Sequence, residues 1–156
     1  MRIDLENPIG PGGGRVELEF EWSFVVPEYG ADRMGRYQGA QGWVYELAQW
    51  YPRMYVFDDV QGWNPLPYLG QGEFYLDYGD FDVEITVPGD FIVVGGGELL
   101  NPGEVLTQEQ QRRLERARTS SETVAIVAAN EVGNPRSRPA GQGPLTWRFR
   151  LSNARD

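Results

Sequence analysis

Apolar and polar residues alternate in several short segments of this sequence, and a period of two residues restricts the chain to a strand-rich fold. In residues 15–22 every even-numbered residue is apolar, and glutamates lie between them. In residues 145–151 every odd-numbered residue is apolar. Because successive side chains of a strand point to opposite faces of a sheet, each segment predicts a strand with one buried and one solvated face.

Further strands are expected between turn signals. Gly79-Asp80 separates residues 73–78 from residues 82–87 and predicts a β-hairpin. Other short strand candidates are residues 43–49, 53–57, 91–94 and 123–129. With the two alternating segments, these give about eight strands, which favours an all-β fold, an antiparallel β-sandwich, over a doubly wound sheet.

Residues 107–118 have the pattern of a helix rather than a strand. Thr107 and Gln110 resemble a capping box, and arginines gather toward the C-terminal end, where the helix dipole favours cations. The apolar stripe is limited to Leu114 and Ala117, so we expect one inserted, largely exposed helix.

The domain organisation expected from these patterns is simple. Residues 1–156 are predicted to form a single β-sandwich domain, a size that suits one hydrophobic core. Residues 1–14 end in a glycine-rich run and predict a flexible N-terminal segment. Residues 104–143 are expected to be a helix and loop insertion between strands.

The charge and the missing residue types narrow the function. The formal net charge is −9, so neither nucleic acid nor an anionic membrane surface has an electrostatic reason to bind. Histidine and cysteine are absent, which excludes disulfides and histidine-based triads and removes the commonest zinc ligands. We therefore expect a soluble domain with no catalytic residues, no metal ligands and no cofactor. The first residues lack the pattern of a signal peptide, and the localisation stays open.

Acidic pairs, glycine runs and aromatic residues each have a simple structural interpretation. The carboxylates of Asp58-Asp59 and residues 77–82 suit calcium binding or glycoside hydrolysis, but their spacing is typical of exposed strand and turn positions. Gly95-Gly96-Gly97 lacks the helix and lysine of a phosphate-binding loop and predicts a backbone bend. The aromatic residues between 43 and 75 fit a sandwich core first, and a carbohydrate platform or a domain interface second.

A series of motifs follows one order along the chain. Residues 48–59 read Ala-Gln-Trp-Tyr-Pro-Arg-Met-Tyr-Val-Phe-Asp-Asp. Gly-Trp, Pro-Tyr-Leu-Gly and Gly-Glu-Phe-Tyr follow before residue 76, and residues 78–88 continue the series. Further matches are Gly97-Glu98-Leu99, Asn101-Pro102 and the Leu-Thr-Trp-Arg-Phe-Arg of residues 145–150. Together these motifs resemble the N-terminal domain of gluzincin zinc aminopeptidases, the relatives of aminopeptidase N and leukotriene hydrolase.

The resemblance implies a saddle-shaped β-sandwich that precedes a thermolysin-like catalytic domain. The family's H-E-x-x-H zinc motif and its Gly-x-Met-Glu-Asn substrate loop are absent from this sequence, so zinc is implied only for a separate catalytic domain. The implied role is a non-catalytic domain that packs on that partner and caps its peptide cleft. Peptide binding is expected only in that context, and a homodimer through the same interface is a further expectation.

The resemblance also implies which residues face the partner. In the family a loop glutamine often lines the pocket for the first substrate residue, and Gln49 or Gln41 is the candidate here. A glutamine that is hydrogen-bonded to backbone is the simpler interpretation. The residues expected at the domain interface are Trp50, Tyr51, Arg53, Trp63 and Tyr68.

Two other functions remain open from the sequence. One is a carbohydrate-binding or adhesion-type β-sandwich that uses exposed Trp43, Trp50 or Trp63. The other is a hydrolase that works with Asp and Glu alone and needs two facing carboxylates in a concave site.

Overall fold

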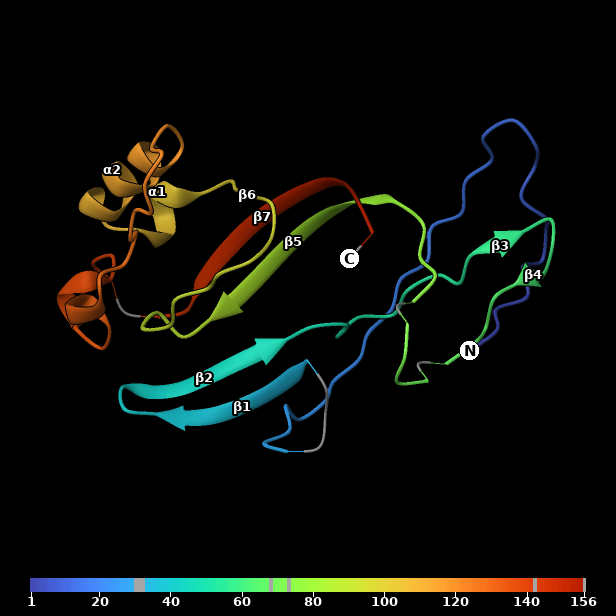
Figure 1. Cartoon of the computed structure of the whole chain (residues 1–156). Helices are drawn as coiled ribbons and strands as arrows, with labels where there is room; N and C mark the ends of the chain where they lie inside the picture. The colour runs from blue at the N-terminus through green and yellow to red at the C-terminus, as the bar shows by residue number, and fades with distance from the viewer. Residues whose placement is uncertain (30–32, 68, 73, 142, 156) are drawn as a thin grey trace.

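The computed structural model describes residues 1–29, 33–67, 69–72, 74–141 and 143–155, and it is built mainly from antiparallel strands (Figure 1). Strands account for 25% of the chain and helices for 13%, which confirms a β-rich fold with few helices. Two small sheets are hairpins, β1 (Met34–Gly39) with β2 (Gly42–Leu47) and β3 (Phe57–Asp58) with β4 (Gly62–Trp63). The third sheet has the order β5-β7-β6, from β5 (Gly79–Val87), β7 (Leu145–Ala154) and β6 (Glu98–Leu99).

The β5–β7 pair forms the centre of the fold because both strands are amphipathic in the same register. On one face Ile85 lies opposite Trp147, and on the other face Asp82 lies opposite Arg150. The Arg150 Nε donates to the Asp82 Oδ1 at 2.7 Å, so the polar face is held by cross-strand ion pairs. The strand predicted for residues 145–151 is confirmed and extends further, to Ala154.

The hydrophobic core lies on the apolar face of this pair. Trp147 and Phe149 of β7 are 2% and 7% exposed, and they pack with Val105 and Leu106 at the end of α1 (Pro102–Val105). The Asn101 side chain bonds to the β7 backbone and fixes the start of α1 above the sheet. These four apolar residues are the buried core of the described chain, with a shell of half-buried aliphatic residues around them.

The segment between β6 and β7 packs on the sheet through Val105 and Leu106, with the half-buried Leu114 and Ile126 beside them, and polar contacts add to this attachment. It contains α2 (Gln108–Ala117) and two 3₁₀ turns, η1 (Ala129–Glu131) and η2 (Pro135–Ser137). The predicted capping box is confirmed, because the Thr107 backbone N–H donates to Gln110 Oε1 and the Gln110 N–H donates to Thr107 Oγ1. Gln110 is fully buried and its Nε2 donates to the Ser137 carbonyl at 2.9 Å.

Several expected strands are not formed by the described residues. The segments without a strand are residues 15–22, 53–56, 74–78, 91–94 and 123–129, and Glu73 lies outside the described residues. The predicted hairpin at Gly79-Asp80 is wrong, because both residues belong to β5, whose partner is β7. A period of two residues makes a segment amphipathic, but a strand also needs a neighbouring edge with which to bond.

Two elements have no strong pattern in the sequence. β1 contains two glycines and polar residues, and it forms because the tight turn at Ala40-Gln41 folds it against β2. α1 is a single turn that begins with Pro102 and has an acidic residue in its first turn.

Seven strands in three separate sheets are found among the described residues. Figure 1 shows β3 and β4 at the opposite end of the molecule from α1 and α2.

Candidate interaction surface

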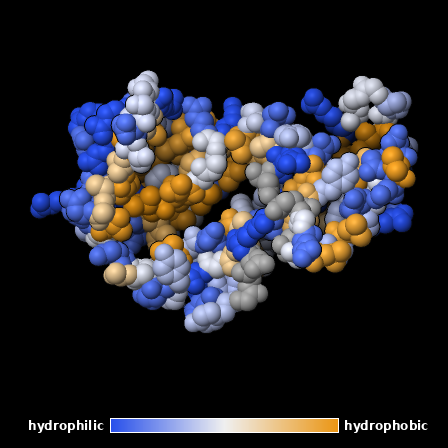
Figure 2. Space-filling model, in the orientation of Figure 1, coloured by the Kyte–Doolittle hydropathy of each residue, from blue (hydrophilic) through white to orange (hydrophobic). Residues whose placement is uncertain are grey.

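The residues that precede β5 carry most of the exposed apolar side chains. Among the described residues, large apolar side chains that are at least 36% exposed greatly outnumber the four buried ones, and all but three of them precede β5. Figure 2 shows hydrophobic side chains between the helices and the β1–β2 hairpin, and again at the β3–β4 end. Exposed apolar side chains that gather in patches are typical of interaction sites.

The total surface is too large for a folded monomer of this mass. The accessible surface is 12755 Å² for 17.6 kDa. Folded monomers of this size expose about 7,900 Å², so the excess is about 4,800 Å². Obligate interfaces bury about 2,000–5,000 Å² in total, which is about 1,000–2,500 Å² on each partner, so the excess is larger than the surface that one permanent partner covers.

Four aromatic rings, here called the aromatic row, join three segments that are distant in sequence. Successive ring centroids are 6.2 Å apart for Trp22 and Trp50, 5.6 Å for Trp50 and Tyr51, and 6.0 Å for Tyr51 and Phe81. The indole N–H of Trp22 also donates to the Trp50 carbonyl at 3.1 Å. The guanidinium of Arg53 lies 5.8 Å from the Tyr51 ring centroid, within cation–π range.

The structure therefore brings together three of the five residues predicted at the interface. Trp50, Tyr51 and Arg53 lie in or beside the aromatic row, and all three are half-buried. Trp63 lies in β4, is 57% exposed and contacts the Phe57 ring across the β3–β4 hairpin. Tyr68 lies outside the described residues.

The two predicted cleft glutamines lie at opposite ends of β2. Gln41 is exposed in the β1–β2 turn, and its side chain lies close to Gly133. A Cβ added at Gly133 would be 2.6 Å from the Gln41 Oε1. Gln49 follows β2, is half-buried and has a φ of 55°, in the left-handed region. The six residues of β2 separate them by about 20 Å, so one small pocket does not hold both side chains.

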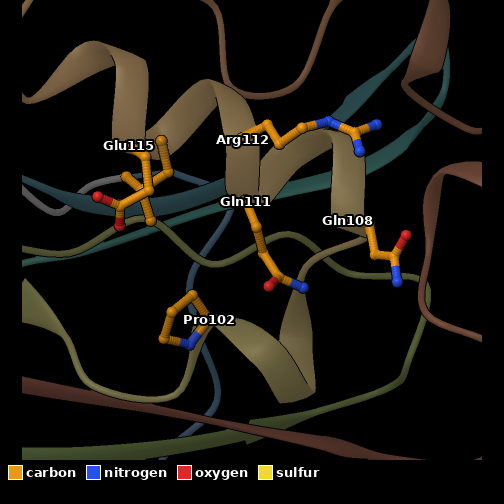
Figure 3. A pocket seen from close by; sticks show the side chains of 6 residues that line it. Pro102, Gln108, Gln111, Arg112 and Glu115 are labelled. Carbon is orange, nitrogen blue, oxygen red and sulfur yellow. The ribbon is translucent and has the colours of Figure 1, made fainter.

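Two hollows on the described surface lie away from these glutamines. The larger, about 440 Å³, lies between α1 and α2, where Pro102 faces Gln111 and Glu115 (Figure 3). The smaller, about 230 Å³, is lined mainly by glycine and proline residues together with Arg138. Both are open surface depressions. Neither lining holds a serine, threonine or tyrosine hydroxyl that a neighbouring carboxylate would activate.

Charged groups inside the insertion hold α2 against η1. The Arg113 guanidinium lies 2.6 Å from the Glu131 carboxylate, and the Ala128 backbone N–H donates to the same carboxylate at 2.7 Å. The hydrogen bond from Arg113, followed by the one from Ala128, lowers the pKa of Glu131 below its ordinary value. Burial lowers the pKa of Arg138, whose Nη1 donates to the Phe91 carbonyl at 3.5 Å. These contacts have a structural role, since each joins two parts of the fold.

Metal ligands and membrane spans were both expected to be absent from this chain. In the part of the chain that the structure describes, no three Asp or Glu side chains gather into a group able to hold a metal ion. None of the described helices has both the length and the apolar character needed to cross a bilayer.

No family model, no curated protein and no solved structure matches this chain. The link to gluzincin aminopeptidases accordingly depends on the motifs of the sequence itself. Of these motifs, residues 48–59 include Trp50 and Tyr51, which belong to the aromatic row, and Arg53, which lies beside it. The sequence pattern did not single out the other two rings of the row, Trp22 and Phe81, as interface residues. The available signal was their position on the apolar face of an alternating segment.

Proposed function

We propose that this chain is a non-catalytic β-domain that packs on the catalytic domain of a zinc aminopeptidase and caps its peptide cleft. The observation that carries the proposal is the exposed apolar surface that precedes β5, together with the aromatic row that joins part of it to β5. A partner that covers this surface through an interface of obligate size would remove about 1,000–2,500 Å² of it from water. The motifs shared with the gluzincin aminopeptidases name the partner.

The same proposal accounts for the saddle-like β-sandwich that the resemblance implies. The three small sheets of the chain would join into two facing layers when the apolar residues before β5 are covered. Two aromatic pairs already join these parts. Tyr45 of β2 contacts Phe91, which follows β5, and Tyr51 contacts Phe81 of β5. In this arrangement zinc, the general base and the peptide are held by the catalytic domain alone.

The test is to mix the chain with a zinc-loaded gluzincin catalytic domain that lacks its own N-terminal domain. Calorimetry should show association with a negative heat-capacity change, because apolar surface is buried. Peptidase activity should rise on addition of the chain. Absence of both association and activation would refute the proposal.

Variants locate the interface. Replacing Trp50 and Tyr51 by alanine should weaken association by about 2 kcal/mol or more, since buried aromatic anchors dominate interface energies. The matched control replaces Leu100 and Val132, which are 45% and 43% exposed and lie outside the proposed interface. The control should bind as the parent chain does.

A carbohydrate-binding module is the second candidate function. Trp63 favours it, because its ring is 57% exposed and is held edge-on by Phe57 at 5.2 Å. An exposed, fixed indole is able to stack on a sugar ring. A saturable change in tryptophan fluorescence during titration with glycans, lost in Trp63→Ala, would favour this function over the first.

A further inference from the structure

Residues 15–26 form an extended segment that has the side-chain pattern of a strand and no strand partner. Apolar side chains occupy its even positions from Val16 to Phe24, and these are 36% to 47% exposed. Within the described part of the chain, no backbone N–H or C=O of this segment makes a backbone hydrogen bond. Such a segment has two free edges, each able to bond to another strand.

The segment is fixed at one end. Trp22 belongs to the aromatic row and donates its indole N–H to the Trp50 carbonyl. Directly after the segment, the Pro27 carbonyl accepts a hydrogen bond of 2.9 Å from the backbone N–H of Arg36 in β1. The segment is thus positioned against the first hairpin, while its own backbone groups have no backbone partner among the described residues.

Charge decides which strand edge the segment fits. Glu17, Glu19 and Glu21 occupy its polar face, and no ion pair to them is found among the described residues. A second copy of this chain is a poor partner. Two copies of the segment that pair antiparallel with their apolar faces on the same side bring their glutamates opposite one another. The net charge of −9 adds to this repulsion.

The free edge of β5 is also a poor partner. β5 lies at the end of the central sheet, and its polar face carries Asp80, Asp82 and Glu84. Pairing there would place the glutamates of residues 15–26 beside Asp82 and Glu84, which already pair with Arg150 and Arg148 of β7, so the glutamates would gain no cationic partner. Like charges on neighbouring strands are destabilising, so the favoured partner has a basic polar face.

We propose that residues 15–26 add as a strand to an unpaired sheet edge of the domain on which this chain packs. That edge carries apolar residues on one face and Lys or Arg on the other. The mode is β-strand addition, in which backbone hydrogen bonds supply affinity and alternate side chains supply specificity. The inference deepens the proposed function and rests on it for the identity of the partner.

A synthetic 12-residue peptide of alternating valine and lysine is the direct probe. One control peptide alternates valine and glutamate, and a second has the same composition as the probe in two blocks, six valines followed by six lysines. Calorimetry should give a Kd for the probe at least about tenfold below that for either control. Hydrogen exchange should slow at residues 15–26 in the presence of the probe.

Two pairs of variants test the geometry and the charge. Leu18→Pro removes a backbone donor and should weaken probe binding about tenfold, whereas Leu5→Pro, at a position 39% exposed outside the segment, should not. Replacing Glu17, Glu19 and Glu21 by glutamine should weaken probe binding far more than the control triple Glu46→Gln, Asp59→Asn and Glu122→Gln, which changes the net charge equally. Equal binding of the three peptides, or slowed exchange only outside residues 15–26, would overturn the inference.

The catalytic domain separates this inference from the proposed function. A complex with that domain in which residues 15–26 exchange as fast as in the free chain overturns strand addition and leaves the proposed function standing. Binding of the alternating basic peptide at residues 15–26, without any complex with the catalytic domain, supports strand addition and refutes the proposed partner. Slowed exchange at residues 15–26 in the complex supports both.

Discussion

Replacing Trp147 by alanine should remove a large part of the stability of the described fold. Trp147 is 2% exposed and packs with Val105, Leu106 and Phe149, which are the other members of the buried core. Truncation of a buried Trp costs about 3–5 kcal/mol, from lost apolar burial together with the cavity left behind. For a chain of this length the expected fall in Tm is roughly 6–20 °C, since each kcal/mol corresponds to roughly 2–4 °C.

The indole N–H offsets part of this cost. Within the described residues, the Nε1 of Trp147 is buried and has no hydrogen-bond partner. Its removal leaves no acceptor unpaired and returns the desolvation cost of an unpaired donor, so the expected loss lies toward the lower end of the range. Trp147→Phe keeps most of the volume, so it should cost clearly less than Trp147→Ala.

The matched control is Trp63→Ala, the same substitution at a site 57% exposed whose recorded ring contact is with Phe57. Its expected cost is about 0.5–1.5 kcal/mol, the value of one aromatic pair. Urea denaturation followed by far-UV circular dichroism measures both variants, since tryptophan emission itself changes on substitution. If the two variants lose the same free energy of unfolding, the core does not lie where the structure places it.

Three further predictions concern the backbone, the insertion and pH. Gly97→Ala should destabilise the folded chain by about 1–3 kcal/mol, because the φ of Gly97 is +84° and a Cβ there would lie 2.2 Å from the Arg150 carbonyl oxygen. The control Gly103→Ala in α1 places a Cβ with no atom within 4 Å and should be neutral or stabilising. Thermal unfolding compares the two variants. Gln110→Ala should lower the free energy of unfolding by about 1–3 kcal/mol, because the Ser137 carbonyl and the Thr107 N–H lose their hydrogen-bond partner. The control Gln108→Ala changes an exposed side chain and should lower it by less than about 0.5 kcal/mol. Urea denaturation measures both. The pKa of Glu131 is lowered in the folded chain, so its contribution is fully present above pH 4.5 and is lost as the pH falls through the folded value. The hydrogen-exchange protection factors of α2, which correct for the intrinsic slowing of exchange in acid, should therefore fall below pH 4.5, and Glu131→Gln should remove that dependence. An unchanged pH profile in this variant would contradict the Arg113 contact as its cause.

The elements predicted correctly from sequence are those whose partner has a matching pattern. Residues 145–151 and residues 82–87 each alternate, and in the structure they pair directly, so one pattern supports the other. The helix was marked by the Thr107 capping box, a signal contained in four consecutive residues. In both cases the sequence signal that predicts the element lies within the segments that form it.

The elements that were missed depend on tertiary contacts. β1 has little strand pattern of its own and forms because β2 offers an edge across a tight turn. α1 is too short to show a helical period, and it is defined by Asn101, which bonds to the Thr146 carbonyl and the Arg148 N–H of β7. A bond between residues more than forty positions apart leaves no local trace in a single sequence.

The candidate surface was foreseen in its residue types and not in its arrangement. Trp50, Tyr51 and Arg53 were expected at an interface, yet Trp22 and Phe81 complete the aromatic row from distant segments. Gln41 and Gln49 are close in sequence but lie at the two ends of β2, because a strand separates its ends by its full length. The choice between Gln49 and Gln41 as the cleft residue stays a prediction.

The segment of residues 15–22 shows why a correct pattern is insufficient. Its alternation is as regular as that of residues 145–151, yet only the latter forms a strand. The difference lies in the available edge. Residues 145–151 have β5 on one side and β6 on the other, whereas Asp82 and Glu84 at the free edge of β5 already pair with arginines of β7 and offer a second acidic face no cationic partner. The strand propensity of residues 15–22 is therefore unused within the chain, and a basic edge supplied from outside would convert it into structure and cover the apolar side chains that it now exposes.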